Sequence, residues 1–238
     1  MKAYLDNSIL IDYEKDASIL YIGDNVSYRC SYIHLIELME STHNLEERKK
    51  QRFCTIECLT GNIFMVNTDG NVVIEEMNTC SRYYETLNSP FSIMLKHFTK
   101  EQSNHWLEGK DPDTLIKYLN IDKKRINNYT VGEILKEYGD FIQYYVTVSD
   151  NDHRMASFMS FFNVLDLLGF WRDRAKAGSM LNRTYDAQHA YFATGCDYFV
   201  SNDHRTCMKA NVLYQYYGYK TRALSLVEFN ELIAKSTN

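Results

Sequence analysis

The sequence predicts an α/β fold with a central parallel sheet. Three observations support this prediction: a short apolar strand opens the chain, strands and helices alternate near the carboxyl end, and the long middle part is patterned mostly as helix. With 238 residues and 45% apolar content, the chain can bury a sizeable core. We interpret it as one domain with a mostly helical insertion.

The amino-terminal part should contain strands, helices and one hairpin. In chain order, we expect a strand at 2–5, a helix from 8 to 13, a strand at 19–22 with 28–30 as a second candidate, a helix from 31, a helix at 45–59, and a hairpin at 62–78. The hairpin is expected because Asp69-Gly70 is a strong tight-turn signal between two apolar runs.

Helical patterning then dominates residues 80–176, with a break at Asp111-Pro112-Asp113. The carboxyl-terminal part should alternate, with a helix at 185–194, a strand at 197–201, a helix at 204–217, a strand at 221–224 and a helix at 226–234. Thr184 has the residue type and position of an N-cap for the first of these helices. The alternation predicts that the strands are parallel.

Four acidic residues lie where an apolar strand ends or a helix begins: Asp6, Glu37, Asp186 and Asp203. The carboxyl ends of parallel strands share one edge of a sheet, so we expect these side chains to meet. Asp186 should fall in the first turn of its helix, where the helix dipole favours a carboxylate. Two carboxylates ~4 Å apart repel by roughly 4 kcal/mol at an effective dielectric of ~20. The pocket should therefore bind one or two Mg²⁺ or Mn²⁺ ions, which suit phosphate substrates.

The segments around these acids resemble the PIN-domain family of nucleases. Asp6 in Leu-Asp-Asn-Ser matches the family's first-strand acid, and Glu37 in Ile-His-Leu-Ile-Glu-Leu matches its helix glutamate. Asp186 in Tyr-Asp-Ala-Gln-His-Ala matches the third acid, and Asp203 in Tyr-Phe-Val-Ser-Asn-Asp matches the last. Ser201 stands where the family usually has Thr or Ser.

The resemblance covers about residues 1–43 and 165–238. It implies a three-layer α/β/α sandwich with a parallel sheet, and a Mg²⁺- or Mn²⁺-dependent ribonuclease whose four acids are both catalytic and metal-binding. Residues 44–164 have no assigned counterpart and form the predicted insertion, which includes the hairpin near 62–78. A toxin role with an antitoxin partner follows by family analogy only.

Other polar residues are candidates for supporting roles. Asn7, Ser201 and Asn202 are expected to orient carboxylates or water, and each has the alternative of binding loop backbone. Four basic residues near Asp186 are candidate phosphate contacts, with an exposed helix end as the alternative: Arg172, Arg174, Lys176 and Arg183.

Several features have ordinary structural interpretations. Asp6 and Asp203 are each candidate helix caps, and His34 and His189 are expected to be hydrogen-bonded core residues. The basic run at 48–52 is interpreted as a solvated helix face in which Glu46 pairs with Lys50. Cys54 and Cys58, one helical turn apart, are expected to be buried thiols.

The bulk properties narrow the classes of function. The net charge of −5 argues mildly against sequence-independent nucleic-acid binding. The longest apolar stretch is too short to span a bilayer, and a soluble, cytoplasmic protein is expected. We therefore predict a metal-dependent endonuclease, with RNA favoured over DNA. The alternative is a non-catalytic module of the same fold that binds RNA or a protein partner. The sequence leaves open whether the protein forms a homodimer.

Overall fold

A computed structural model describes residues 1–238 apart from 41–44, 69–71, 90–111, 150–153, 173–178 and 237–238. Its centre is a four-stranded sheet in which all neighbouring strands are parallel. The strand order is β2-β1-β5-β6, where β1 is Lys2–Leu5, β2 is Ser27–Arg29, β5 is Tyr198–Val200 and β6 is Arg222–Leu224. The prediction of an α/β fold with a central parallel sheet is therefore confirmed.

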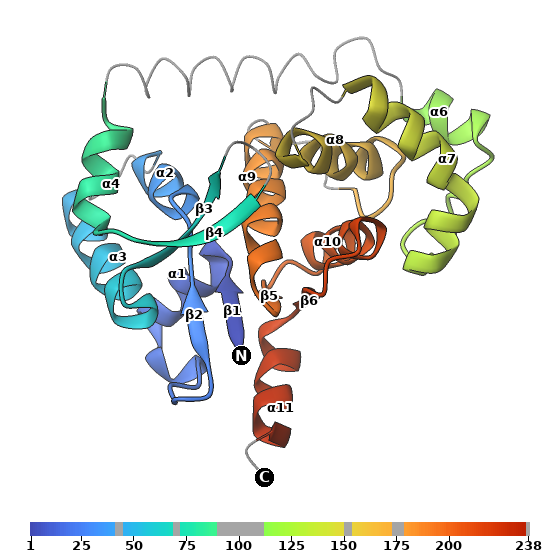
Figure 1. The fold of residues 1–238 in the computed structure, drawn as a ribbon. Coiled ribbons are helices and arrows are strands. Elements are labelled where there is room, and N and C mark those ends of the chain that lie inside the picture. The colour runs from blue at the N-terminus through green and yellow to red at the C-terminus, as the bar shows by residue number, and fades with distance from the viewer. Residues whose placement is uncertain (41–44, 69–71, 90–111, 150–153, 173–178, 237–238) are drawn as a thin grey trace.

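Helices surround this sheet (Figure 1). They are α1 (Asn7–Lys15), η1 (Ala17–Ile19), α2 (Ile33–Met39), α3 (Leu45–Thr60), α4 (Cys80–Leu87), α6 (Pro112–Tyr118), α7 (Val131–Ser149), α8 (Arg154–Leu167), α9 (Ser179–Phe192), η2 (Ala193–Gly195), α10 (His204–Tyr217) and α11 (Leu226–Ser236). No helix in the described part of the chain is long and apolar enough to cross a membrane.

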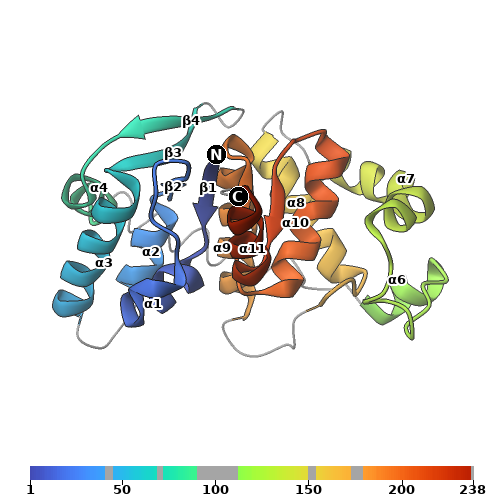
Figure 2. The same cartoon turned by 90° about the horizontal axis from the view of Figure 1, so that it is seen from below.

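The two faces of the sheet carry separate hydrophobic clusters, because side chains alternate along each strand. Tyr4 and Phe199 belong to a cluster built with α7, α8, α9 and α10. Leu5 and Val200, the next residues along the same strands, belong to a cluster built with α1, α3 and α11. Viewed from below, α1 and α3 lie on one side of β1, and α8 and α10 lie on the other (Figure 2). Helices therefore cover both faces of the sheet.

The predicted hairpin is present as a separate two-stranded sheet beside the central one. Its strands β3 (Ile63–Thr68) and β4 (Val72–Met77) are antiparallel, while the predicted turn at 69–71 lies outside the described residues. Phe64 forms a parallel bridge with Cys30, which follows β2, and the Met65 N–H donates to the Cys30 carbonyl at 2.7 Å. Part of the predicted insertion is thus joined directly to the core beside β2.

The strand order changes direction at β1. From β1 the chain goes to β2 on one side, and it later returns to β5 on the other side. In open α/β sheets, the crevice beyond the carboxyl ends of the strands at such a switch point is where ligands bind. Asp6 directly follows β1, and its backbone N–H donates to the Val200 carbonyl of β5 at 2.9 Å. The fold therefore places the first predicted acid at the switch point.

Three local predictions are wrong. Residues 19–22 form no strand, and 17–19 form a short 3₁₀ helix instead. Helix α9 begins at Ser179, so Thr184 lies inside it and does not cap it, and Asp186 lies in mid-helix. The reason is tertiary: Arg183, one residue before Thr184, is buried in an ion pair with Asp166, and this packing outweighs the local capping signal.

Candidate functional site

Asp6 is held at the end of β1 by the start of the next helix. It is the N-cap of α1, and its carboxylate accepts hydrogen bonds from the Asn7 N–H and the Ser8 hydroxyl, both at 2.8 Å. A third bond comes from β5, where the Ser201 hydroxyl donates to Asp6 at 2.7 Å. Only 7% of Asp6 is exposed. The interpretation of Asp6 as a helix cap is therefore confirmed.

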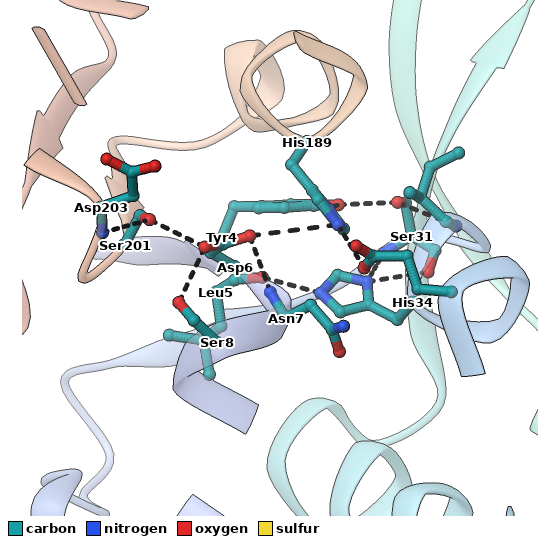
Figure 3. A network of polar contacts seen from close by, with 12 residues as sticks. Tyr4, Leu5, Asp6, Asn7, Ser8, Ser31, His34, His189, Ser201 and Asp203 are labelled. Carbon is teal, nitrogen blue, oxygen red and sulfur yellow. Dashed lines mark hydrogen bonds and ion pairs between the residues drawn. The ribbon is translucent and has the colours of Figure 1, made fainter. Parts of the chain in front are cut away.

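Asp203 approaches the same place from the end of β5. It is the N-cap of α10, where its Oδ1 accepts from the N–H groups of Arg205 at 2.8 Å and Thr206 at 3.4 Å. The Asp203 N–H donates to the Ser201 hydroxyl at 3.1 Å. Ser201 thus joins the Asp6 and Asp203 segments, as Figure 3 shows.

Asp186 lies within α9. Burial raises the pKa of its carboxyl well above the usual value, and the nearby charges of Asp6 and Asp203 raise it further. Lys209 and His189 act in the opposite direction but do not cancel these effects. Asp186 is therefore near enough to Asp6 and Asp203 for their charges to act on it.

Glu37 is joined to this group through His189. The His189 Nε2 lies 2.9 Å from Glu37 Oε2 and 4.0 Å from Asp6 Oδ1. Burial lowers the pKa of His189, but the charges of Glu37, Asp6 and Asp186 outweigh it, so the pKa lies above the usual value. His189 is buried and hydrogen-bonded as predicted, and its partner is one of the predicted site residues.

Two further contacts fix the elements that carry these residues. Tyr185 lies one turn before His189 on α9, and its hydroxyl donates to Glu40, one turn after Glu37 on α2, at 2.7 Å. His34 is a buried core residue, as predicted, with its Nε2 2.8 Å from the Leu5 carbonyl. Burial lowers the pKa of His34 well below the usual value, so this imidazole is neutral.

The remaining candidates differ in their surroundings. The Asn7 side-chain carbonyl accepts from the guanidinium of Arg52, whereas Asn202 donates to Asp12 at 3.0 Å, outside the four acids. Arg172 is exposed, and Arg174 and Lys176 lie outside the described residues. Arg183 is 5% exposed and forms a 2.7 Å ion pair with Asp166, so a phosphate cannot reach it in this arrangement.

The basic run at 48–52 was predicted to be a solvated helix face, and this is wrong for Arg52. Arg52 is buried, and its guanidinium donates to both carboxylate oxygens of Glu14. Glu46 pairs with Lys49 and not with Lys50. The predicted buried thiols on the same helix, Cys54 and Cys58, are exposed, with their sulfur atoms 3.8 Å apart. Helix α3 therefore turns Arg52 toward α1, because Glu14 and Asn7 are there to accept its hydrogen bonds.

The donor set suits a hard divalent cation, because carboxylate oxygens are the preferred ligands of Mg²⁺. Within the described residues, however, no three His, Cys, Asp or Glu side chains are spaced to hold a metal ion as they stand. Asp6 is already bonded to Ser8 and Ser201, and Glu37 to His189. The acids are therefore neighbours that repel each other, not a preformed coordination shell.

No family model, curated protein or solved structure matches this chain. The chemistry of the site must therefore be argued from its own residues. Asp6, Asp186 and Asp203 bring negative charge to a strand-end crevice, and Glu37 lies next to them through His189. These residues therefore concentrate acidic side chains at the carboxyl ends of β1 and β5.

Proposed function

We propose that this protein is a metal-dependent endonuclease of PIN type that hydrolyses phosphodiester bonds, with RNA as the favoured substrate. The observation that carries the proposal is the convergence of three acids: the Ser201 hydroxyl joins Asp6 to the Asp203 segment. Burial raises the pKa of the Asp186 carboxyl, and the nearby charges of Asp6 and Asp203 raise it further. These residues are far apart in the sequence and come from three elements. Holding repelling carboxylates close together costs stability, and a bound cation would offset that cost.

In this proposal, Asp6, Glu37, Asp186 and Asp203 hold Mg²⁺ or Mn²⁺. A divalent cation supplies charge neutralisation at the phosphate and activation of water for in-line attack. The chain's own residues keep the carboxylates in place: Ser201 bonds to Asp6, and His189 bonds to Glu37. Without a cation, the negative pocket would repel a phosphate, so activity should depend strictly on metal.

The test is cleavage of mixed RNA and DNA by the full-length protein with Mg²⁺ or Mn²⁺, and again with EDTA. Asp6→Asn should lower cleavage by at least ~100-fold, because it removes a metal ligand. Asp197→Asn is the matched control: Asp197 accepts from the Lys2 N–H at the opposite end of β1, and the amide can keep that bond.

Two results would overturn the proposal. One is cleavage by Asp6→Asn at the wild-type rate, which would place the chemistry elsewhere. The other is tight, metal-independent RNA binding with no product under any condition. That second result would identify a binding module and not an enzyme.

A further inference from the structure

A chain of buried hydrogen bonds runs from Ser31 through Tyr4 to His189 (Figure 3). The Ser31 hydroxyl is 2.6 Å from the Tyr4 hydroxyl, which is 2.8 Å from His189 Nδ1. His189 Nε2 is in turn 2.9 Å from Glu37 Oε2. Ser31 and Tyr4 are 0% exposed and His189 is 1% exposed. Three buried polar side chains therefore connect the protein interior to one predicted metal ligand, Glu37.

The direction of the protons in this chain follows from its inner end. The Ser31 oxygen accepts from the Ile33 N–H at 3.3 Å, so its own proton needs an acceptor. Within the described part of the chain, the acceptor in reach is the Tyr4 oxygen. When His189 is neutral, Ser31 therefore donates to Tyr4, and Tyr4 donates to His189 Nδ1. The opposite direction would leave a buried hydroxyl proton unpaired.

The tautomer of a neutral histidine is set by the hydrogen bond that its other nitrogen makes. Because Nδ1 of His189 accepts from Tyr4, the proton of the neutral imidazole lies on Nε2. That Nε2–H donates to Glu37 Oε2 and leaves Oε1 without a bond from His189. In this tautomer, Nε2 has no lone pair to offer a metal, so His189 acts on Glu37 and not as a ligand itself.

We propose that Tyr4 and His189 are positioning residues that hold the Glu37 carboxylate in one orientation for a divalent cation. Tyr4 sets the tautomer of His189, and His189 engages Oε2 so that Oε1 is left for the cation. The neighbouring Tyr185–Glu40 hydrogen bond joins α9 to the end of α2. It thereby limits the relative movement of the two helices that carry His189 and Glu37. The metal-binding part of this inference rests on the proposed function, whereas the tautomer does not.

The first experiment compares two buried tyrosines. Tyr4→Phe removes only the relay hydroxyl. The matched control is Tyr28→Phe, because Tyr28 is also buried in a strand of the sheet and its hydroxyl donates to the Tyr21 carbonyl at 2.6 Å. Loss of a residue that orients a ligand usually costs about 10–100-fold in metal affinity. Calorimetry with Mn²⁺ should show that loss for Tyr4→Phe and none for Tyr28→Phe. Equal affinities in the two variants would overturn the proposal.

A second pair of variants guards against a folding failure of Tyr4→Phe. His189→Gln keeps an N–H donor near Glu37, whereas His189→Leu keeps none. We expect Mn²⁺ affinity in the order wild type, His189→Gln, His189→Leu. If the two His189 variants bound Mn²⁺ equally well, a positioning role would be contradicted. A purely structural role would depend on the size of the side chain more than on its N–H donor.

The tautomer is measured separately by ¹⁵N NMR of histidine in the metal-free protein, at about pH 9, above the ordinary range of histidine titration. We expect His189 to carry its proton on Nε2 in the wild type and to become a tautomer mixture in Tyr4→Phe. A wild-type proton on Nδ1 would overturn the relay. If the wild type binds neither Mn²⁺ nor Mg²⁺ but shows the Nε2 tautomer, the proposed function fails and the relay stands.

Discussion

The Ser201 hydroxyl donates a hydrogen bond to the Asp6 carboxylate at 2.7 Å, across 195 residues of sequence. Ser201 directly follows β5 and Asp6 directly follows β1, and these strands are neighbours at the point where the strand order reverses. The same hydroxyl accepts the Asp203 N–H at 3.1 Å. A single buried serine therefore sets the spacing between the first and last acids of the proposed site.

Ser201→Ala tests this role. The variant loses a hydrogen bond to a charged acceptor, and such bonds are worth about 1.5–3 kcal/mol. We expect cleavage to fall by roughly 10–100-fold, measured with saturating Mg²⁺. Ser157→Ala is the control, because Ser157 is also buried and bonds to the Tyr217 hydroxyl at 2.7 Å, away from the acids. An equal loss of activity in both variants would show a general effect of removing a buried hydroxyl.

Binding of a cation should stabilise the fold. A ligand at 100 times its dissociation constant adds about 2.7 kcal/mol, which corresponds to a Tm increase of about 5–10 °C for a chain of this size. We expect that shift with Mn²⁺, its reversal by EDTA, and its absence in Asp6→Asn. Thermal unfolding followed by circular dichroism measures it. A shift of the same size in Asp6→Asn would place the cation at another site.

Asp186 should destabilise the metal-free protein. Its folded-state pKa lies above the unfolded value, mainly because of burial, so its contribution favours the fold at low pH and is lost as pH rises through the folded pKa. Asp186→Asn removes that penalty. In EDTA at neutral pH, we expect this variant to unfold at a higher Tm than wild type by a few degrees, about 2–4 °C for each kcal/mol.

The pH dependence of this effect is diagnostic. The advantage of Asp186→Asn should be greatest above the folded pKa and should vanish in acid, where wild-type Asp186 is protonated in both states. Thermal unfolding across that range measures the difference. Asp140→Asn, which changes an exposed carboxylate on α7, should show no such trend. A constant difference at every pH would mean that charge is not the cause.

The sequence was informative where a local rule decides the position. Asp6 and Asp203 were predicted at the sheet edge because each follows an apolar strand, and both are found there as helix caps. The His189–Glu37 contact could not be predicted, because its partners lie 152 residues apart and His189 looks like an ordinary core histidine. Arg52 was misjudged for the same reason: its partner Glu14 is 38 residues away. Helical periodicity shows which face a residue is on, but not which charge it will meet.

The buried ion cluster that joins α8, α9 and α10 should contribute strongly to stability. Asp166 on α8 pairs with Arg183 on α9 at 2.7 Å and with Lys209 on α10 at 3.2 Å, and all three residues are 5% exposed or less. Asp166→Ala would leave two cations without their buried carboxylate partner. Breaking a buried ion pair typically costs about 3–5 kcal/mol, because the remaining charge has neither water nor a partner.

Urea unfolding at neutral pH measures that cost. The control is Glu46→Ala, which removes the partner of Lys49 in a pair where the Glu46 side chain is 73% exposed. Exposed pairs contribute about 0–1 kcal/mol, so this variant should unfold almost like wild type. If Asp166→Ala cost no more than Glu46→Ala, the cluster would not hold α8, α9 and α10 together. The position of Asp186 and His189 on α9 would then need another explanation.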